Sequence, residues 1–152
     1  MQPSPTDQPQ YRPVPAMLDL PAMEHEILDF WAANDTFAAS LARTAGGQPW
    51  TFFEGPPTAN GMPGTHHIEA RVFKDVFPRF KTMQGFHVER KAGWDCHGLP
   101  VELAVEKELG FNGKPDIEAY GVEPFNARCR ESVTRHVGAF AELTTRMGYW
   151  VN

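Results

Sequence analysis

The spacing of apolar residues changes several times along this chain of 152 residues, and the changes divide it into segments. Residues 1–17 contain five prolines and no periodic apolar pattern, which predicts a flexible leader. Over residues 20–34, apolar side chains recur at the spacing of one helix face, and Asp19 is placed to cap the first turn. A shorter helical turn follows over residues 35–42. Residues 18–48 are therefore expected to form an N-terminal helical segment.

Two short apolar runs bounded by Gly and Pro predict buried strands, at residues 49–54 and 86–91. Between them, residues 66–84 carry apolar side chains at helical spacing. A strand, a helix and a second strand form a crossover unit, whose right-handed connection places the loops after both strands at one edge of a parallel sheet. We therefore expect an α/β fold with a parallel sheet, in which ligands bind at that edge.

Helical patterns dominate the rest of the chain. Pro78 lies inside the helix over residues 66–84 and removes a backbone N–H, so we expect a kink or a break just before it. Gly85 is expected to end that helix. Three further segments are expected: a helix over 99–109, a short helical turn within 114–121, and one long helix over 124–147. Residues 149–151 begin a new apolar run, so the domain is expected to be incomplete.

Charge and cysteine content narrow the class of protein. Lys and Arg number 14 against 19 Asp and Glu, and a net charge of −5 is not the basic footprint of a free-standing nucleic-acid binder. Cys96 and Cys129 form no short motif and follow no signal peptide, so we expect reduced thiols in a soluble, cytoplasmic protein. No apolar run approaches the ~18 residues that a membrane span needs, so no membrane partner is expected.

The first candidate loop consists of Gly64, Thr65, His66 and His67 at the predicted start of a helix. Backbone N–H groups and the helix dipole favour an anion there, and an imidazole can donate hydrogen bonds to it, so the loop is a candidate phosphate site. Paired histidines in a loop rich in Gly and Pro are equally typical of a polar surface. Because adjacent histidines are expected to point in different directions, a chelated metal is not expected.

The second candidate loop, residues 93–98, follows the second predicted strand. Asp95 lies between two glycines and beside Trp94, and its carboxylate is suited to an ammonium group. The alternative is that Asp95 only stabilises the turn, by accepting a hydrogen bond from the backbone. Cys96 beside His97 is not expected to act as a nucleophile with its base, because neighbouring side chains rarely meet in that way. We expect Cys96 to be buried or half buried.

Three motifs together are more specific than either loop. They are GPPTANG at residues 55–61, the histidine-bearing helix start, and GWDCHGLPVE at residues 93–102. In combination they resemble the N-terminal part of the class I aminoacyl-tRNA synthetases, and among these the isoleucyl-tRNA synthetases. The motif MQGF at residues 83–86, where the predicted helix ends, is similar to that of the related valyl and leucyl enzymes. The resemblance extends from about Leu20 to the C-terminus, so only the proline-rich leader falls outside it.

This resemblance implies a Rossmann-like catalytic domain, of which residues 49–152 hold the first part. It also implies an ATP-dependent ligase that forms isoleucyl-adenylate, with Mg²⁺ accompanying ATP, and then passes isoleucine to tRNA(Ile). Such an enzyme is expected to be monomeric, and zinc is not supported within this chain.

The resemblance assigns roles to residues by their position in the motifs. Gly55 and Pro56 would line the isoleucine pocket, and Asp95 would bind the α-ammonium group. Phe53 and Glu54 would flank the pocket. The loop from Gly64 to His67 would hold ATP, with both histidines acting in catalysis.

The helix start departs from the family pattern His-x-Gly-His, because this chain has Gly64, Thr65, His66 and His67 in that order. An imidazole stands where a glycine normally lets the adenine approach the backbone closely. We expect a relocated but working nucleotide site, because Gly64 now supplies the flexible position.

The family's second phosphate loop, of the Lys-Met-Ser-Lys-Ser type, has no counterpart in this sequence, and neither does its editing insert or anticodon-binding domain. We therefore expect an N-terminal fragment with no ligase activity of its own, and tRNA contacts outside it. Two alternatives stay open. One is an adenylate-binding paralogue without ligase activity, and the other is a structural module in which the histidines and Asp95 are only turn residues.

Overall fold

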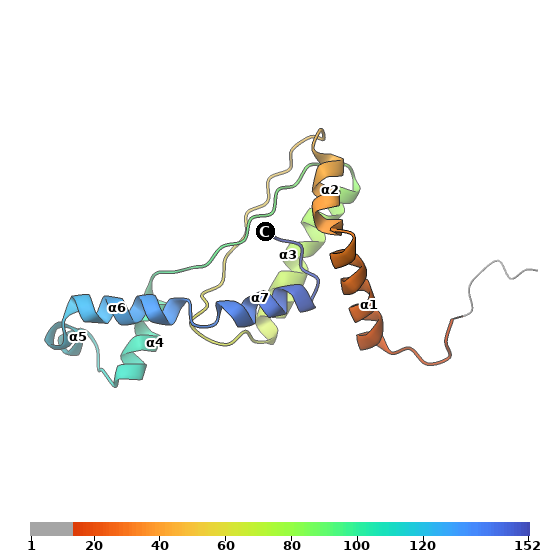
Figure 1. The fold of residues 1–152 in the computed structure, drawn as a ribbon. Helices are drawn as coiled ribbons and strands as arrows, with labels where there is room; N and C mark the ends of the chain where they lie inside the picture. Colours follow the sequence, from red (N-terminus) through yellow and green to blue (C-terminus); the bar gives the residue numbers. More distant parts are fainter. Residues whose placement is uncertain (1–13) are drawn as a thin grey trace, which may run out of the picture.

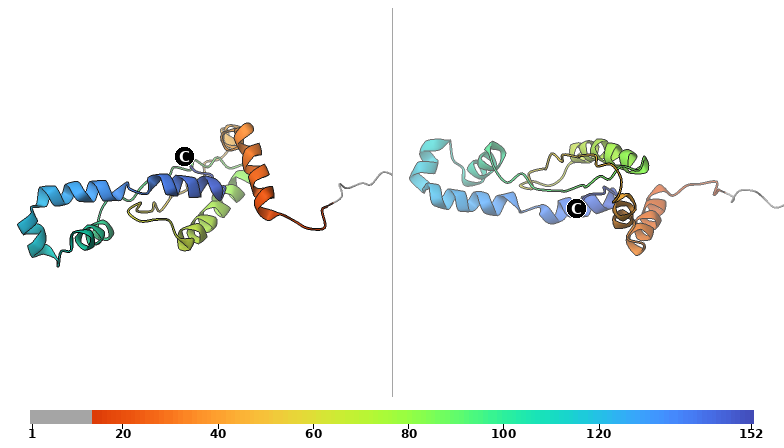
Figure 2. Two further views of the ribbon diagram at one scale, coloured as in Figure 1. Left: turned by 60° about the horizontal axis from the view of Figure 1, so that its bottom comes forward. Right: turned by 90° about the horizontal axis from the view of Figure 1, so that it is seen from above.

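The computed structural model describes residues 14–152 and consists of helices joined by extended segments. The leader expected over residues 1–17 lies almost wholly outside the described residues. The helices of the described part are α1 (Leu20–Ala33), α2 (Thr36–Thr44), α3 (Thr65–Met83), α4 (Leu99–Leu109), α5 (Lys114–Tyr120), α6 (Val122–Val133) and α7 (Val137–Arg146). Helices α4, α5 and α6 gather at one end of an elongated arrangement and α1, α2, α3 and α7 at the other, with α6 and α7 nearly end to end (Figure 1 and Figure 2).

The first helix begins where its cap predicts. The Asp19 side chain accepts a hydrogen bond from the Ala22 N–H at 3.1 Å. Pro21 lies in the first turn, where its missing N–H would have no helical partner. Helix α1 packs on α2, and α2 packs on α3.

The side chain of Arg79, which stacks on two aromatic rings, also connects α1 to α3. The Arg79 guanidinium lies 5.3 Å from the ring centroid of Trp31 and 4.0 Å from that of Trp150. It donates to the Asp75 carboxylate at 2.8 Å and to the Gly148 carbonyl at 2.7 Å. A planar guanidinium can stack on aromatic faces while its edge keeps these hydrogen bonds. One side chain thus joins α1, α3 and the segment after α7.

The two expected strands are extended segments that form no sheet in residues 14–152, so the predicted α/β fold with a Rossmann-like parallel sheet is wrong for this structure. One parallel bridge joins Pro49 and His87, and the Trp50 N–H donates to the His87 carbonyl at 2.9 Å. The two segments run parallel at this bridge, as the crossover unit predicts, but the bridge is isolated and no ladder of strand hydrogen bonds extends from it. The three prolines within residues 49–57 offer no N–H to a neighbouring strand, which removes donors along this segment.

The helices after the first loop depart from prediction at two points. Of the kink or break expected before Pro78, the break is wrong, because α3 continues through that residue. Gly85 with φ +92° ends the helix as expected. A single helix over residues 124–147 is also wrong, because α6 and α7 are separate. At the break, the His136 N–H donates to the carbonyl of Ala59 at 3.0 Å and so ties this point to the loop before α3.

The core of the described part is small, and one face of α3 is uncovered. Phe125, Val133 and Phe140 are buried, as expected for inward residues of α6 and α7. Six apolar side chains of α3 are 49% to 81% exposed: Val72, Phe73, Val76, Phe77, Phe80 and Met83. No helix in the described part is long and apolar enough to cross a membrane.

Candidate functional site

Residues 54–61, which form the first loop between an extended segment and α3, touch the second loop at residues 93–98. The Asp95 N–H donates to the carbonyl of Pro57 at 3.0 Å, which joins the second loop to the first. A Cβ added at Gly93 would lie 3.8 Å from the Cβ of Pro56, so the loops are also in van der Waals reach. The two extended segments that carry them can be followed side by side in Figure 1. The structure therefore brings together the loops that hold Pro56 and Asp95.

The ring of Phe140 on α7 connects these loops to the start of α3. Phe140 is 0% exposed. Its ring makes edge contacts with Trp94, at 5.9 Å between centroids, and with His67, at 4.9 Å. A fully packed aromatic ring restricts the positions of its neighbours. The second loop and the histidine turn thus pack against the same side chain.

The first turn of α3 is closed by a reciprocal pair of hydrogen bonds. Gly64 precedes the helix in an extended conformation, its N–H donates to Nδ1 of His67 at 3.0 Å, and the His67 N–H donates to the Gly64 carbonyl at 3.0 Å. Thr65 and His66 are exposed. The expectation that the two histidines point apart is wrong, because their ring centroids are only 3.9 Å apart. The bond to Gly64 turns the His67 ring back along the helix, where it meets the ring of His66.

The surroundings of His67 favour its neutral form. Burial lowers the pKa of His67, and the nearby positive charge of His66, Arg71 and Lys74 lowers it further. In a neutral ring whose Nδ1 accepts a hydrogen bond, the proton sits on Nε2. Nε2–H is then a donor that a phosphate oxygen can use.

The second loop places Asp95 in a turn and leaves its carboxylate exposed. Asp95 is exposed, and one of its carboxylate oxygens accepts a long hydrogen bond of 3.4 Å from the His97 N–H, as a turn residue does. Cys96 is exposed, so the expectation of a buried or half-buried thiol is wrong, because the loop places it on the surface. Both cysteines are free thiols, as expected. Burial, followed by the charge of Glu102, raises the pKa of Cys129, which keeps that thiol protonated.

A charged cluster behind the first loop was not identified from the sequence. Lys74 Nζ donates to a carboxylate oxygen of Glu54 at 2.8 Å and to the carbonyl of Gly55 at 2.6 Å. The Tyr149 hydroxyl donates to the other Glu54 oxygen. Burial and the hydrogen bond to Glu54 raise the pKa of Tyr149, so its hydroxyl stays protonated. The available signal was the position of Lys74, seven residues after His67 and therefore on the same face of the helix.

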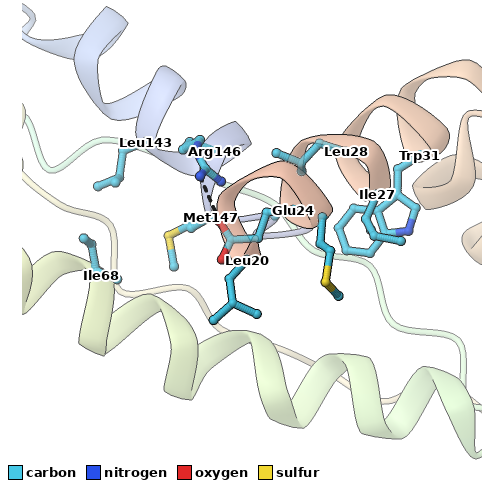
Figure 3. Close-up of a pocket in the computed structure, with 11 residues that line it drawn as sticks. Leu20, Glu24, Ile27, Leu28, Trp31, Ile68, Leu143, Arg146 and Met147 are labelled. Atoms are coloured by element: carbon cyan, nitrogen blue, oxygen red, sulfur yellow. Dashed lines mark ion pairs between the residues drawn. The ribbon is translucent and has the colours of Figure 1, made fainter. Parts of the chain in front are cut away.

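A hollow of about 360 Å³ beside the second loop is lined by Cys96, His97 and Cys129, among others. Two further hollows lie near these elements. The smaller, of about 250 Å³, adjoins the loops and is lined by Glu54, Arg71, Trp94 and Tyr149, among others. The larger, of about 640 Å³, lies between α1, α3 and α7 (Figure 3). Its charged lining is an ion pair of 2.8 Å between Glu24 and Arg146, and none of the predicted site residues lines it. The smaller hollow is lined by Glu54 and Tyr149 of the charged cluster, but neither Asp95 nor the loop from Gly64 to His67 lines it.

The residues present do not fit a metal site of the chain's own. Within residues 14–152, no group of three or more His, Cys, Asp or Glu side chains is placed to hold a metal ion.

Known proteins match most of this chain. The family described as class I tRNA synthetases (I, L, M and V) matches residues 26–152. The isoleucine–tRNA ligase of Cutibacterium acnes is 80% identical over 143 residues, which are 94% of this chain and 13% of that protein. The isoleucine–tRNA ligase of Streptomyces coelicolor is 74% identical over 144 residues, 95% of this chain and 14% of that protein. The isoleucine–tRNA ligase of Thermus thermophilus is 51% identical over 134 residues, 88% of this chain and 13% of that protein. The chain thus spans a small fraction of the length of the curated relatives it matches.

Proposed function

This chain belongs to the family of class I tRNA synthetases (I, L, M and V), and from that premise we propose that it is part of an isoleucine–tRNA ligase. The observation that carries the proposal is the identity of 80% and 74% to two proteins of that name. In the whole protein, isoleucine and ATP form isoleucyl-adenylate and release pyrophosphate, and the isoleucyl group then passes to tRNA(Ile). These matches favour neither an adenylate-binding paralogue nor a purely structural module.

The amino-acid subsite is proposed at the contact between the two loops. Gly55 and Pro56 line the pocket for the isoleucine side chain, and the Asp95 carboxylate receives the α-ammonium group. The contact of Asp95 with Pro57 through the backbone supports this arrangement, because it holds the carboxylate-bearing turn against the first loop. The exposed position of Asp95 leaves its carboxylate accessible to a charged ligand.

The ATP subsite is proposed at the loop from Gly64 to His67. The start of α3 presents backbone N–H groups and the positive end of the helix dipole, which favour phosphate. A neutral His67 adds an Nε2–H donor, and His66 lies against it. We propose that both histidines stabilise the charge that develops when the isoleucine carboxylate attacks the α-phosphate. Mg²⁺ bound with ATP would neutralise phosphate charge, and phosphate oxygens and water would hold it, because residues 14–152 offer no group of His, Cys, Asp or Glu side chains placed to do so.

The whole protein is proposed to be longer than this chain. The uncovered apolar face of α3 supports this, since such a surface is normally packed against other residues. We propose that tRNA(Ile) binds outside these residues, whose net charge of −5 gives them little attraction for phosphate. A cytoplasmic, monomeric enzyme is the corresponding proposal for the whole protein.

Isoleucine-dependent exchange of pyrophosphate into ATP by the full-length protein tests the function. We expect exchange with isoleucine, weaker exchange with valine, and no turnover from the 152-residue chain alone. Asp95→Asn is expected to raise the KM for isoleucine by about tenfold or more, because it removes a charge-assisted hydrogen bond. Asp29→Asn, at an exposed position of α1, is the matched control and should leave the KM unchanged. Faster exchange with another amino acid than with isoleucine would refute the proposal.

A further inference from the structure

Lys74 on α3 donates to two adjacent residues of the first loop. Its ammonium group lies 2.6 Å from the carbonyl oxygen of Gly55 and 2.8 Å from a carboxylate oxygen of Glu54. One contact fixes the direction of a backbone carbonyl and the other fixes a side chain. A single ammonium group therefore determines how the chain enters Pro56.

The Glu54 carboxylate is held from both sides. The Glu54 side chain is 7% exposed, so an unpaired negative charge there would be costly. One oxygen accepts from Lys74 and the other from the Tyr149 hydroxyl. Tyr149 is itself 6% exposed and follows α7, which gives the cluster a packed support on the side away from the loop.

The same helix carries the histidine turn at its start. Lys74 lies seven residues after His67 and therefore on the same face of α3, where His67 meets Phe140 and Lys74 meets Glu54 and Gly55. We propose that Lys74 is a positioning residue, which sets the shape of the isoleucine subsite by holding the Gly55 carbonyl and the Glu54 carboxylate. The inference rests on the proposed function and adds to it a residue that touches neither substrate.

The test uses the full-length protein with two changes at one position. Lys74→Met removes the charge and the donors, while Lys74→Arg keeps both. We expect Lys74→Met to raise the KM for isoleucine by about tenfold or more, as loss of a charge-assisted hydrogen bond does, with the KM for ATP changed less than about twofold. Lys74→Arg should recover most of the isoleucine KM. Lys107→Met, at an exposed position of α4, is the matched control.

Two further measurements separate positioning from folding. Tyr149→Phe removes only the hydroxyl that holds Glu54, and it should raise the KM for isoleucine about threefold with the KM for ATP unchanged. This variant carries the test if Lys74→Met fails to fold. Hydrogen exchange should show faster exchange of residues 54–61 in Lys74→Met than in the wild type, without faster exchange in α6.

The outcomes are distinguishable. A wild-type protein without isoleucine-dependent exchange would refute the proposed function, and hydrogen exchange of residues 54–61 would then still decide whether Lys74 holds the loop. An active wild type whose Lys74→Met variant keeps both KM values within about twofold would overturn the inference alone. Equal increases in both KM values together with a lower melting temperature would also overturn it, because they indicate a general structural role.

Discussion

Alanine substitutions at one buried and one exposed phenylalanine test which helix faces of this chain are covered. Phe140 on α7 is 0% exposed and contacts the rings of His67 and Trp94. Phe77 on α3 is 62% exposed and belongs to the uncovered apolar face. Replacing each by alanine removes the same atoms from a helix, so the difference in helix propensity is the same and cancels in the comparison.

The expected magnitudes differ because the two rings lose different amounts of burial. Removing a fully buried phenyl ring costs about 3–5 kcal/mol of unfolding free energy, including the cavity that is left. Phe77 keeps well under half of its surface away from water, so Phe77→Ala is expected to cost less than about 1 kcal/mol in this chain. The expected difference between the two variants is therefore at least about 2 kcal/mol.

Urea unfolding followed by circular dichroism measures both variants against the wild-type chain. Equal losses of stability in the 152-residue chain would refute the exposure assigned to α3. The same pair in the full-length protein tests the proposal that further residues cover α3. There, Phe77→Ala should approach the cost of a buried phenylalanine, and a loss below about 1 kcal/mol would contradict that proposal.

Three other predictions follow from single contacts. Because a Cβ at Gly64 would lie 3.0 Å from the ring of His66, Gly64→His alone should lower isoleucine-dependent exchange more than Gly64→His combined with His66→Gly, and equal losses would contradict this. Because the folded-state pKa of His67 lies below the ordinary 6.5, the unfolded chain binds protons first, so stability should fall as the pH drops through 6.5 towards the lowered value. His67→Gln should weaken this dependence of stability on pH, as measured by urea midpoints between pH 7 and 5. An unchanged dependence would show that other groups cause it. Arg79→Ala should destabilise α1 by about 2 kcal/mol and accelerate its hydrogen exchange, whereas Arg128→Ala, which removes more exposed ion pairs, should not.

Sequence reasoning succeeded where the signal is local. Apolar spacing and caps placed the first helix at 20–34 and another at 99–109, and the structure has α1 over Leu20–Ala33 and α4 over Leu99–Leu109. These patterns depend on residues a few positions apart, which is the range over which a helix forms its hydrogen bonds.

The absence of a sheet from the described residues could not be predicted in the same way, because an apolar run does not reveal whether a partner strand lies beside it. The run at residues 49–54 is extended, but its pairing is limited to the bridge between Pro49 and His87. The break between α6 and α7 has a similar origin, since the His136 N–H bonds to the carbonyl of Ala59 in a distant loop. Both features depend on contacts that spacing along the chain does not encode.

The candidate site shows the same division. The motifs identified the loops, but the cluster behind them depends on Lys74 meeting Glu54 across 20 residues and on Tyr149 meeting Glu54 across 95. The spacing of seven residues puts Lys74 on the same face of α3 as His67, but it does not reveal which residues pack against that face.

Without a sheet in the described residues, a few separate contacts determine where the first loop lies. The carbonyl of Pro57 accepts from Asp95, the carbonyl of Ala59 accepts from His136, and the carbonyl of Gly55 accepts from Lys74. The first two donors are backbone N–H groups, which no side-chain substitution removes. Lys74 is the one side-chain donor of the three, so the loop's position is open to change by mutation at that residue. A substitution there should therefore act on isoleucine binding before it acts on the fold.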